Sequence, residues 1–246
     1  MIKGVLFDLG GTLISYRNVD TVIESILLET KQKKLTRLSI QELIILYKKA
    51  SIAVTHSYID KRFYLHKNLF LDIFKRFTDF ADIEADNEFF KWFSQRHEFL
   101  LIQSFSLIKN ARKTLTDLKK KNLTIGIVSN IDNYMLKQIL KKNEIEHLVD
   151  FDLSSESARS CKPDCKIFEI ARRKAGLEKS ELLFVGDSME HDIVGSNKYG
   201  ILNVFFSEKN ITAPLQTGKY YEKPNYTTDD MILEKEGASN KAPVSA

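Results

Sequence analysis

Two different periods of apolar residues divide this chain into a helical stretch and a stretch in which strands and helices alternate. Between residues 15 and 105, apolar side chains recur every three or four residues, which is typical of helices with one buried face. Four such stripes follow one another, at 19–27, 40–54, 69–77 and 89–101. We therefore expect residues 15–105 to form an all-helical unit whose many aromatic side chains fill its own core.

The rest of the chain has short, continuously apolar runs separated by helical patterns. The runs lie at 5–7, 123–128, 151–153, 182–185 and 201–206, and the helical patterns near 108–118, 136–140, 163–176 and 190–199. Strands that are apolar throughout and alternate with helices are typical of a parallel sheet covered on both faces.

This pattern predicts a two-domain α/β protein. Its core is a doubly wound, mostly parallel sheet formed by residues 1–14 and 106–236, and the helical unit 15–105 is a cap inserted after the first strand. The small and polar residues 237–246 are expected to be disordered.

Composition and charge argue against a nucleic-acid-binding protein and against a membrane protein. The 246 residues include 37 basic and 33 acidic side chains, and their formal net charge of +4 is too evenly spread to favour nucleic acid as a partner. No apolar run reaches the ~18 residues of a membrane span, and the first residues lack the apolar core of a signal peptide. We therefore expect a cytoplasmic protein with no membrane partner. The two cysteines, Cys161 and Cys165, fit neither a redox nor a zinc pattern and are expected to be reduced thiols, and the oligomeric state is left unknown.

Polar side chains follow several of the predicted strands. Because right-handed crossovers place the ends of parallel strands at one edge of the sheet, these groups should meet there. They are Asp8 with Thr12, Ser129 with Asn130, Lys162, and Asp187 with Asp192. Paired carboxylates are typical ligands of Mg²⁺. A hydroxyl, an amide and a lysine can donate hydrogen bonds to the oxygens of an anion, and the backbone amides of the Gly10-Gly11 turn could donate further ones. A carboxylate beside that turn could also act as a nucleophile toward a phosphoryl group.

These residues resemble the haloacid dehalogenase-like hydrolase superfamily. The stretch D-L-G-G-T-L is similar to its first motif, I-V-S-N to its second, the lysine of S-C-K-P-D to its third, and G-D-S-M-E-H-D-I to its fourth. The resemblance covers residues 1–14 and about 106–232, in the expected order, and the helical insert takes the place of the cap found in one branch of the family. It implies a Rossmann-like core.

The resemblance also implies roles for individual residues. It assigns catalysis to Asp8, as nucleophile, and to Lys162, which would neutralise the nucleophile and the phosphoryl oxygens. It assigns substrate binding to Gly11, Thr12, Ser129 and Asn130, and Mg²⁺ ligation to Asp8, the carbonyl of Gly10, Asp187 and Asp192. Two simpler interpretations stay open: Ser188 and Asp192 could cap the following helix, and Lys162 could be a surface residue.

The first motif departs from the family pattern at Gly10. Phosphatases of this family usually carry a second aspartate there, which protonates the leaving group and then activates water. Losing a general acid-base group costs typically ~10²–10⁴-fold in rate. Either the substrate has a good leaving group, such as an acyl or aryl phosphate, or a residue of the cap replaces the acid. The candidates for that replacement are Tyr16, Arg17, His56 and His66.

Two other functions remain as alternatives. One is a 2-haloacid dehalogenase, a branch that also lacks the second aspartate but typically has an aromatic residue at that position and replaces the aspartate corresponding to Asp187. The other is a binding or regulatory protein that has lost catalysis. Because Asp187 is retained beside Asp8 and Lys162, we favour Mg²⁺-dependent hydrolysis of a small phosphorylated compound through an aspartyl-phosphate on Asp8.

Overall fold

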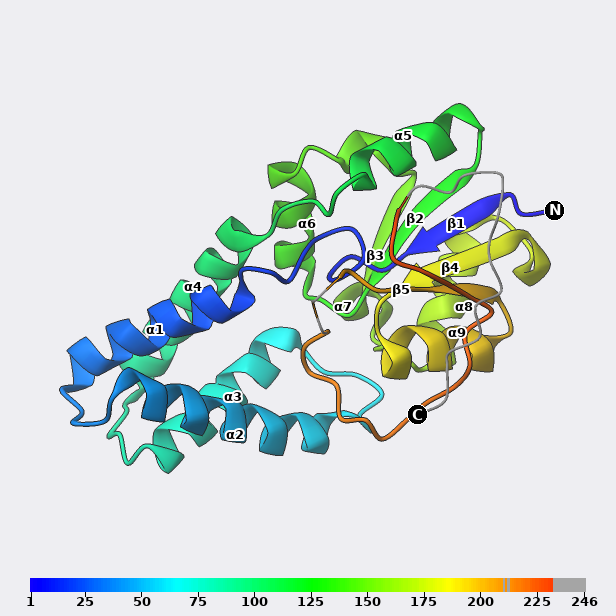
Figure 1. Cartoon of the computed structure of the whole chain (residues 1–246). Coiled ribbons are helices and arrows are strands. Elements are labelled where there is room, and N and C mark those ends of the chain that lie inside the picture. The colour runs from blue at the N-terminus through cyan, green and yellow to red at the C-terminus, as the bar shows by residue number, and fades with distance from the viewer. Residues whose placement is uncertain (210, 212, 232–246) are drawn as a thin grey trace.

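A six-stranded parallel sheet organises the structure, a computed structural model that describes residues 1–209, 211 and 213–231 (Figure 1). In these residues the strand order is β3-β2-β1-β4-β5-β6. The strands are β1 (Gly4–Phe7), β2 (Thr124–Ser129), β3 (Phe151–Ser154), β4 (Leu182–Gly186), β5 (Leu202–Phe206) and β6 (Tyr226–Thr228). The fold is thus α/β with a doubly wound sheet, as the sequence predicts, and β1 lies where the strand order reverses direction.

Helices cover both faces of this sheet. The core helices are α5 (Ala111–Lys120), α6 (Asn133–Lys142), the short α7 (Ser155–Ala158), α8 (Cys165–Ala175) and α9 (Val194–Tyr199). Val5 and Phe7 of β1 belong to the same buried cluster as the apolar faces of α5 and α6, whereas Leu6 packs with α8 on the opposite face. Since neighbouring strand residues point to opposite faces, this explains why β1 is apolar at every position.

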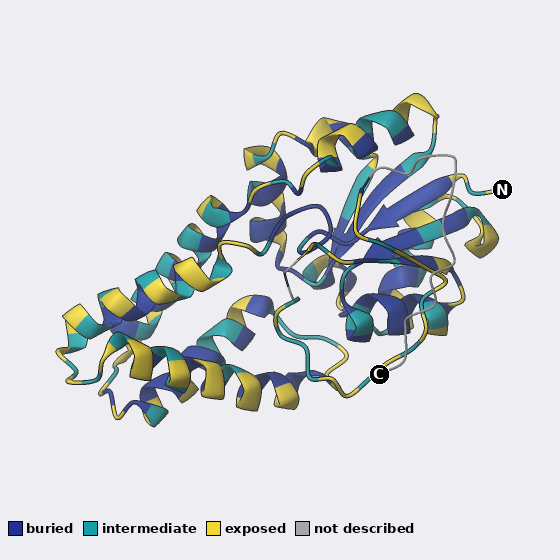
Figure 2. Cartoon of the chain, in the orientation of Figure 1, coloured by how far each residue is buried: buried dark blue, intermediate teal, exposed yellow. Residues whose placement is uncertain are grey.

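Four longer helices come between β1 and α5 in the sequence. In space they lie to one side of the sheet (Figure 1). They are α1 (Val19–Lys34), α2 (Ile40–Tyr58), α3 (His66–Phe80) and α4 (Asn87–Ser104), and we call them the cap. Their buried residues line the inner side of the bundle and their exposed residues the outer side (Figure 2). Phe74 of α3 and Phe93 of α4 stack with ring centroids 3.8 Å apart, so the aromatic stripes form the core of the cap.

One carboxylate joins the cap to the core. Asp132, which precedes α6, accepts hydrogen bonds from the first two backbone amides of α3, those of His66 and Lys67, each at 2.8 Å. These amides have no partner within their own helix, and the positive end of the helix dipole favours a carboxylate at this place. The start of α3 is therefore anchored to the start of α6.

Several elements differ from the sequence prediction, among them the short helix α7, the 3₁₀ turns Glu146–Leu148 and Lys179–Glu181, strand β6 and the start of the last helix. Strand β6 was not expected, because its three residues have no apolar run and it is joined to the sheet by backbone pairing with β5. The predicted helix at 190–199 begins instead with a π-helical turn, Met189–Ile193, before α9. The predicted tail 237–246 lies outside the described residues.

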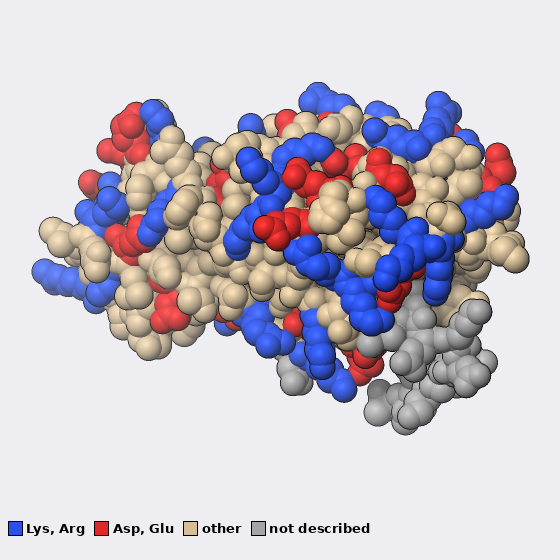
Figure 3. Space-filling model, turned by 90° about the horizontal axis from the view of Figure 1, so that it is seen from above, with Lys and Arg blue, Asp and Glu red and all other residues tan. Residues whose placement is uncertain are grey.

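Two surface properties bear on the possible partners. Lysine and arginine side chains alternate with aspartate and glutamate on the face seen in Figure 3. Among the described helices, none combines the length and the apolar character that crossing a membrane requires.

We expect Phe74→Ala to lower the free energy of unfolding by about 3–5 kcal/mol, because it leaves a cavity in the core of the cap. Phe74 is 0% exposed, whereas Phe99 on α4 is 53% exposed, and Phe99→Ala should change stability by less than about 0.5 kcal/mol. Urea titration followed by circular dichroism measures both. Equal losses in the two variants would contradict this assignment of the core.

Candidate active site

A buried lysine lies between two carboxylates at the carboxyl ends of the central strands. Asp8 directly follows β1, and its backbone amide donates to the carbonyl of Val185 in β4 at 2.8 Å. The Nζ of Lys162 is 2.6 Å from Oδ1 of Asp8 and 2.6 Å from Oδ1 of Asp192. Burial opposes the charge of Lys162, but Asp192 and Asp8 outweigh it and raise its pKa to about 12. Lys162 is therefore a charged member of the site and no surface residue.

A third carboxylate, that of Asp187, completes an acidic cluster. Oxygen atoms of Asp8, Asp187 and Asp192 lie within 4.8 Å of one another. Burial, followed by repulsion from Asp8 and Asp192, raises the pKa of Asp187 well above its usual value, and burial also raises the pKa of Asp8. One ammonium group cannot balance three buried carboxylates. A hard divalent cation with oxygen ligands fits this donor set.

The glycine turn after Asp8 brings the backbone close to Asp187. Gly11 has a φ of 74°, and a Cβ atom there would lie 2.0 Å from Oδ2 of Asp187, so only glycine fits. The amide of Gly11 donates to the carbonyl of Ile14 at 2.6 Å, and Thr12 Oγ1 donates to Asp187 Oδ1 at 3.3 Å. Gly11 and Thr12 thus shape the turn and orient Asp187. Neither lines the cavity described below, and substrate binding by them stays a prediction.

Asn130 and His191 hold the backbone of Lys162 in place. The side-chain amide of Asn130 donates to the carbonyl of Lys162 at 2.9 Å, and its oxygen accepts from the amide of Lys162 at 2.7 Å. His191 Nδ1 is 3.1 Å from the same carbonyl, which only accepts hydrogen bonds, so Nδ1 carries the proton. The sequence did not single out His191, because no local pattern shows that it contacts Lys162. Ser129 is 5% exposed and lines the cavity beside Asn130.

The capping interpretation of the fourth motif is confirmed, whereas ligation of Mg²⁺ by Asp192 stays a prediction. Ser188 accepts a hydrogen bond from the amide of His191 and so caps the turn that follows β4. Asp192 accepts from the amide of Ser188 at 2.9 Å through Oδ2 while it binds Lys162 through Oδ1. Asp192 thereby joins the turn to the lysine.

Tyr16 fills the space next to Gly10. A Cβ atom on Gly10 would lie 2.3 Å from the hydroxyl oxygen of Tyr16, which comes from the loop between β1 and the cap. Burial, followed by the charges of Asp187 and Asp8, raises the pKa of Tyr16 well above its usual value. Tyr16 is thus a neutral phenol, lying where the side chain of a second aspartate would begin.

The other candidates for a replacement acid differ in position. His66 lines the same cavity as Tyr16. Arg17 pairs with Glu208 at 3.0 Å, and His56 is an exposed residue outside the cavity lining.

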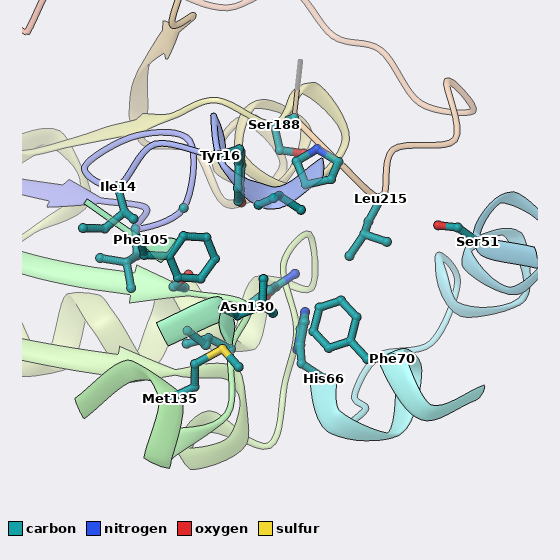
Figure 4. A pocket seen from close by; sticks show the side chains of 18 of the residues that line it. Ile14, Tyr16, Ser51, His66, Phe70, Phe105, Asn130, Met135, Ser188 and Leu215 are labelled. Atoms are coloured by element: carbon teal, nitrogen blue, oxygen red, sulfur yellow. The ribbon is translucent and has the colours of Figure 1, made fainter. Parts of the chain in front are cut away.

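A cavity of about 410 Å³ lies between the strand ends and the cap (Figure 4). Asp8, Lys162 and Asp187 line one end, while aliphatic and aromatic side chains of the cap line the other. The loop 213–215 closes one side, where Leu215 faces Phe70 across the cavity (Figure 4). This volume is within the range of small-molecule sites.

The chain belongs to the haloacid dehalogenase-like hydrolase family, whose model matches residues 2–200. The order of the four motifs along the chain and the cluster of Asp8, Lys162 and Asp187 at the strand ends agree with this membership.

Relatives within this family differ in their names. The chain is 24% identical to pyrimidine 5'-nucleotidase PynA of Streptococcus pneumoniae, over 95% of this chain and 98% of that protein. It is 30% identical to (S)-2-haloacid dehalogenase 4A of Burkholderia cepacia, over 42% of this chain and 44% of that protein. The match thus spans less than half the length of that relative. The crystal structure of the putative HAD-hydrolase YfnB from Bacillus subtilis, bound to magnesium, has a similar fold, with a TM-score of 0.73 and 16% identity over 94% of this chain and 95% of that one.

We expect Lys162→Met to lower the free energy of unfolding by about 3–5 kcal/mol, because it leaves Asp8 and Asp192 buried without their cation. Lys137→Met is the matched control. Lys137 pairs with Asp152 at the same 2.6 Å distance, but its side chain is 59% exposed, so the loss should be at most about 1 kcal/mol. Thermal unfolding in chelator compares the two variants. Similar losses of unfolding free energy in the two variants would show that the buried ion pairs of Lys162 contribute no more to stability than the exposed pair of Lys137.

Proposed function

We propose that this protein is a Mg²⁺-dependent phosphatase that acts on a small phosphorylated compound through Asp8. The observation that carries the proposal is the position of Asp8 at the end of β1, close to the buried ammonium of Lys162 and the carboxylate of Asp187, at one end of a cavity of about 410 Å³. The relative named as a pyrimidine 5'-nucleotidase, matched over nearly its whole length, supports phosphate ester hydrolysis.

Asp8 is the nucleophile in this proposal. Its Oδ1 is held by Lys162, so Oδ2 attacks phosphorus. A bond forms between Oδ2 and phosphorus while the bond from phosphorus to the leaving oxygen breaks, and the electron pair stays on that oxygen. Water then attacks the phosphorus of the aspartyl-phosphate. Its oxygen bonds to phosphorus while the bond from phosphorus to Oδ2 breaks, the electron pair returns to the carboxylate of Asp8, and both protons of the water leave on inorganic phosphate as H2PO4⁻. Lys162 donates to phosphoryl oxygens in both steps.

Asp8, Asp187 and the carbonyl of Gly10 are the residues that would hold Mg²⁺. Both oxygens of Asp192 already accept hydrogen bonds, from Lys162 and from the amide of Ser188, so Asp192 serves chiefly to position the lysine. When bound, the cation offsets the negative charge that phosphate adds to the acidic cluster. Ser129 and Asn130 line the cavity where the phosphate would lie.

A 2-haloacid dehalogenase is the second candidate, and Tyr16 favours it. The ring of Tyr16 lies beside Gly10, the position at which that branch typically has an aromatic residue. Asp187 argues against it, because without a cation its charge would repel both Asp8 and an anionic haloacid. Chloride release from 2-chloropropionate, in the presence of chelator, would establish the dehalogenase and overturn the phosphatase.

The first test is release of inorganic phosphate from acyl, aryl, sugar and nucleotide phosphates. We expect turnover with Mg²⁺, loss in chelator, and a loss of at least about 10³-fold in Asp8→Asn, because the nucleophile is gone. Asp152→Asn is the control, since it removes a carboxylate that pairs with Lys137 outside the cavity. Equal turnover in Asp8→Asn and the control would refute Asp8 as nucleophile. No release from any substrate would favour a binding or regulatory protein.

A carboxylate at position 10 should speed hydrolysis of alkyl phosphates only if Tyr16 makes room. We expect Gly10→Asp combined with Tyr16→Ala to raise turnover of an alkyl phosphate by about 10-fold or more, because it supplies an acid-base group. In the single variant Gly10→Asp the new side chain would collide with the hydroxyl of Tyr16, so its rate should stay at or below that of the wild type. Tyr16→Ala alone is the control. A faster single variant would contradict the tight placement of Tyr16.

A further inference from the structure

The cavity has two chemically different ends. The end at the strands carries the charged residues of the site. The other end is lined mainly by apolar side chains from the cap, from the core helix α6 and from the loop 213–215, together with Asp20, Glu24, Lys48 and Ser51 of the cap. The apolar side chains include Ile23, Ile44, Phe70, Leu101, Met135 and Leu215. A ligand with its phosphate beside Asp8 would therefore extend its organic part into a mainly apolar space.

A row of aromatic rings borders this space. Ring centroids of Tyr64 and His66 are 4.9 Å apart, those of His66 and Phe70 are 6.3 Å apart, and those of Phe70 and His97 are 4.6 Å apart. The row continues from His97 to Phe93 at 5.2 Å, inside the core of the cap. Phe70 is only half-buried and its ring borders the cavity (Figure 4). It presents an aromatic surface, held by its neighbours, on which a flat ring can pack.

His66 adds a buried polar group to this mainly apolar end. The residue is 8% exposed, and its Nδ1 has no hydrogen-bond partner among the described residues. A ring nitrogen of His66 points toward Asn130 in the close-up view (Figure 4). Burial lowers the pKa of His66 to about 3, so the ring is neutral. Buried polar atoms without partners are rare, and a ligand group that binds the imidazole would remove this deficit.

We propose that the substrate is an aryl phosphate, whose aromatic ring packs on Phe70 and whose hydrogen-bonding substituent contacts His66. This inference rests on the phosphatase function proposed above and names its substrate class. The leaving group agrees with the site: a phenolate leaves without being protonated more readily than an alkoxide does, and position 10 offers no carboxylate to protonate it.

Sugar phosphates fit this cavity less well. A sugar would lose hydrogen bonds between its hydroxyl groups and water. The polar side chains of the cap that line the cavity, Asp20, Glu24, Lys48 and Ser51, come from α1 and α2, so they replace only part of these bonds and the lining next to Phe70 stays mainly apolar. A nucleotide has an aromatic base that could pack on Phe70, but its 5'-oxygen is an alkyl leaving group and its ribose would lie in the apolar space. Aryl phosphates avoid both costs.

The test measures kcat/KM for 2-naphthyl phosphate, phenyl phosphate, glucose 6-phosphate, uridine 5'-phosphate and acetyl phosphate. We expect kcat/KM for 2-naphthyl phosphate to be at least about 100-fold higher than for glucose 6-phosphate and for uridine 5'-phosphate. Its kcat/KM should also be higher than that of phenyl phosphate, which has a similar but smaller leaving group, because its KM is lower. Acetyl phosphate is the reference substrate, because it needs no acid and has no ring.

Variants test the contacts themselves. Phe70→Ala should raise KM for 2-naphthyl phosphate about tenfold more than it raises KM for acetyl phosphate, because only the larger substrate reaches the ring. Phe99→Ala, an exposed aromatic residue of the same domain outside the cavity lining, is the matched control and should change neither. His66→Phe should abolish the preference for the best of the three hydroxyphenyl phosphate isomers over phenyl phosphate.

One outcome separates the inference from the phosphatase proposal, and another overturns both. If acetyl phosphate is hydrolysed in an Asp8-dependent reaction but 2-naphthyl phosphate is no better than glucose 6-phosphate or uridine 5'-phosphate, the aryl preference is overturned and the phosphatase stands. Calorimetry on Asp8→Asn gives a readout without turnover. If that variant binds 2-naphthyl phosphate no more tightly than glucose 6-phosphate, and no substrate releases phosphate, both proposals fall.

Discussion

The charge balance around Lys162 is the constraint on which the site depends. A buried ammonium is tolerated only when carboxylates contact it, and Asp8 and Asp192 do so from different strand ends. Asn130 and His191 form hydrogen bonds to the backbone of Lys162, so both its backbone and its side chain are held in place. Four segments far apart in the sequence therefore meet at Lys162, through its ammonium group and through its backbone. The same contacts fix the position of Asp8, the proposed nucleophile.

Gly10 and Gly11 have different structural roles in the first motif. Gly11 lets the backbone approach Asp187 and turn in a left-handed conformation, which a side chain would prevent. Gly10 leaves room for the ring of Tyr16. In this chain the space of the usual second carboxylate thus belongs to a neutral phenol from a different part of the loop. The phenol adds no negative charge to a cluster that already has an excess of it.

Local patterns predicted the parts of the structure that depend on burial. The runs that form β1, β2 and β4 are apolar at nearly every position because both faces of the sheet are covered, and the four stripes of the cap follow helical spacing. Strand β6 could not be found this way, because it is short and polar and its pairing with β5 uses backbone atoms.

The candidate site was predicted in its composition but not in its contacts. The motifs bring Asp8, Lys162, Asp187 and Asp192 together, as expected from strand order. The place of Tyr16 beside Gly10, six residues away, depends on the path of a loop that no periodicity describes. Likewise, the contacts of His191 and of Leu215 arise from the packing of segments that are distant in sequence.

The contact between the start of α3 and Asp132 at the start of α6 also bears on the cavity. Asp132 binds the backbone amide of His66, and the imidazole ring of the same residue borders the cavity. Any separation of α3 from α6 has to break two hydrogen bonds to one carboxylate and withdraw that ring from the ligand in the same step. The start of α3 therefore ties the position of the His66 ring in the cavity to the contact between the cap and the core.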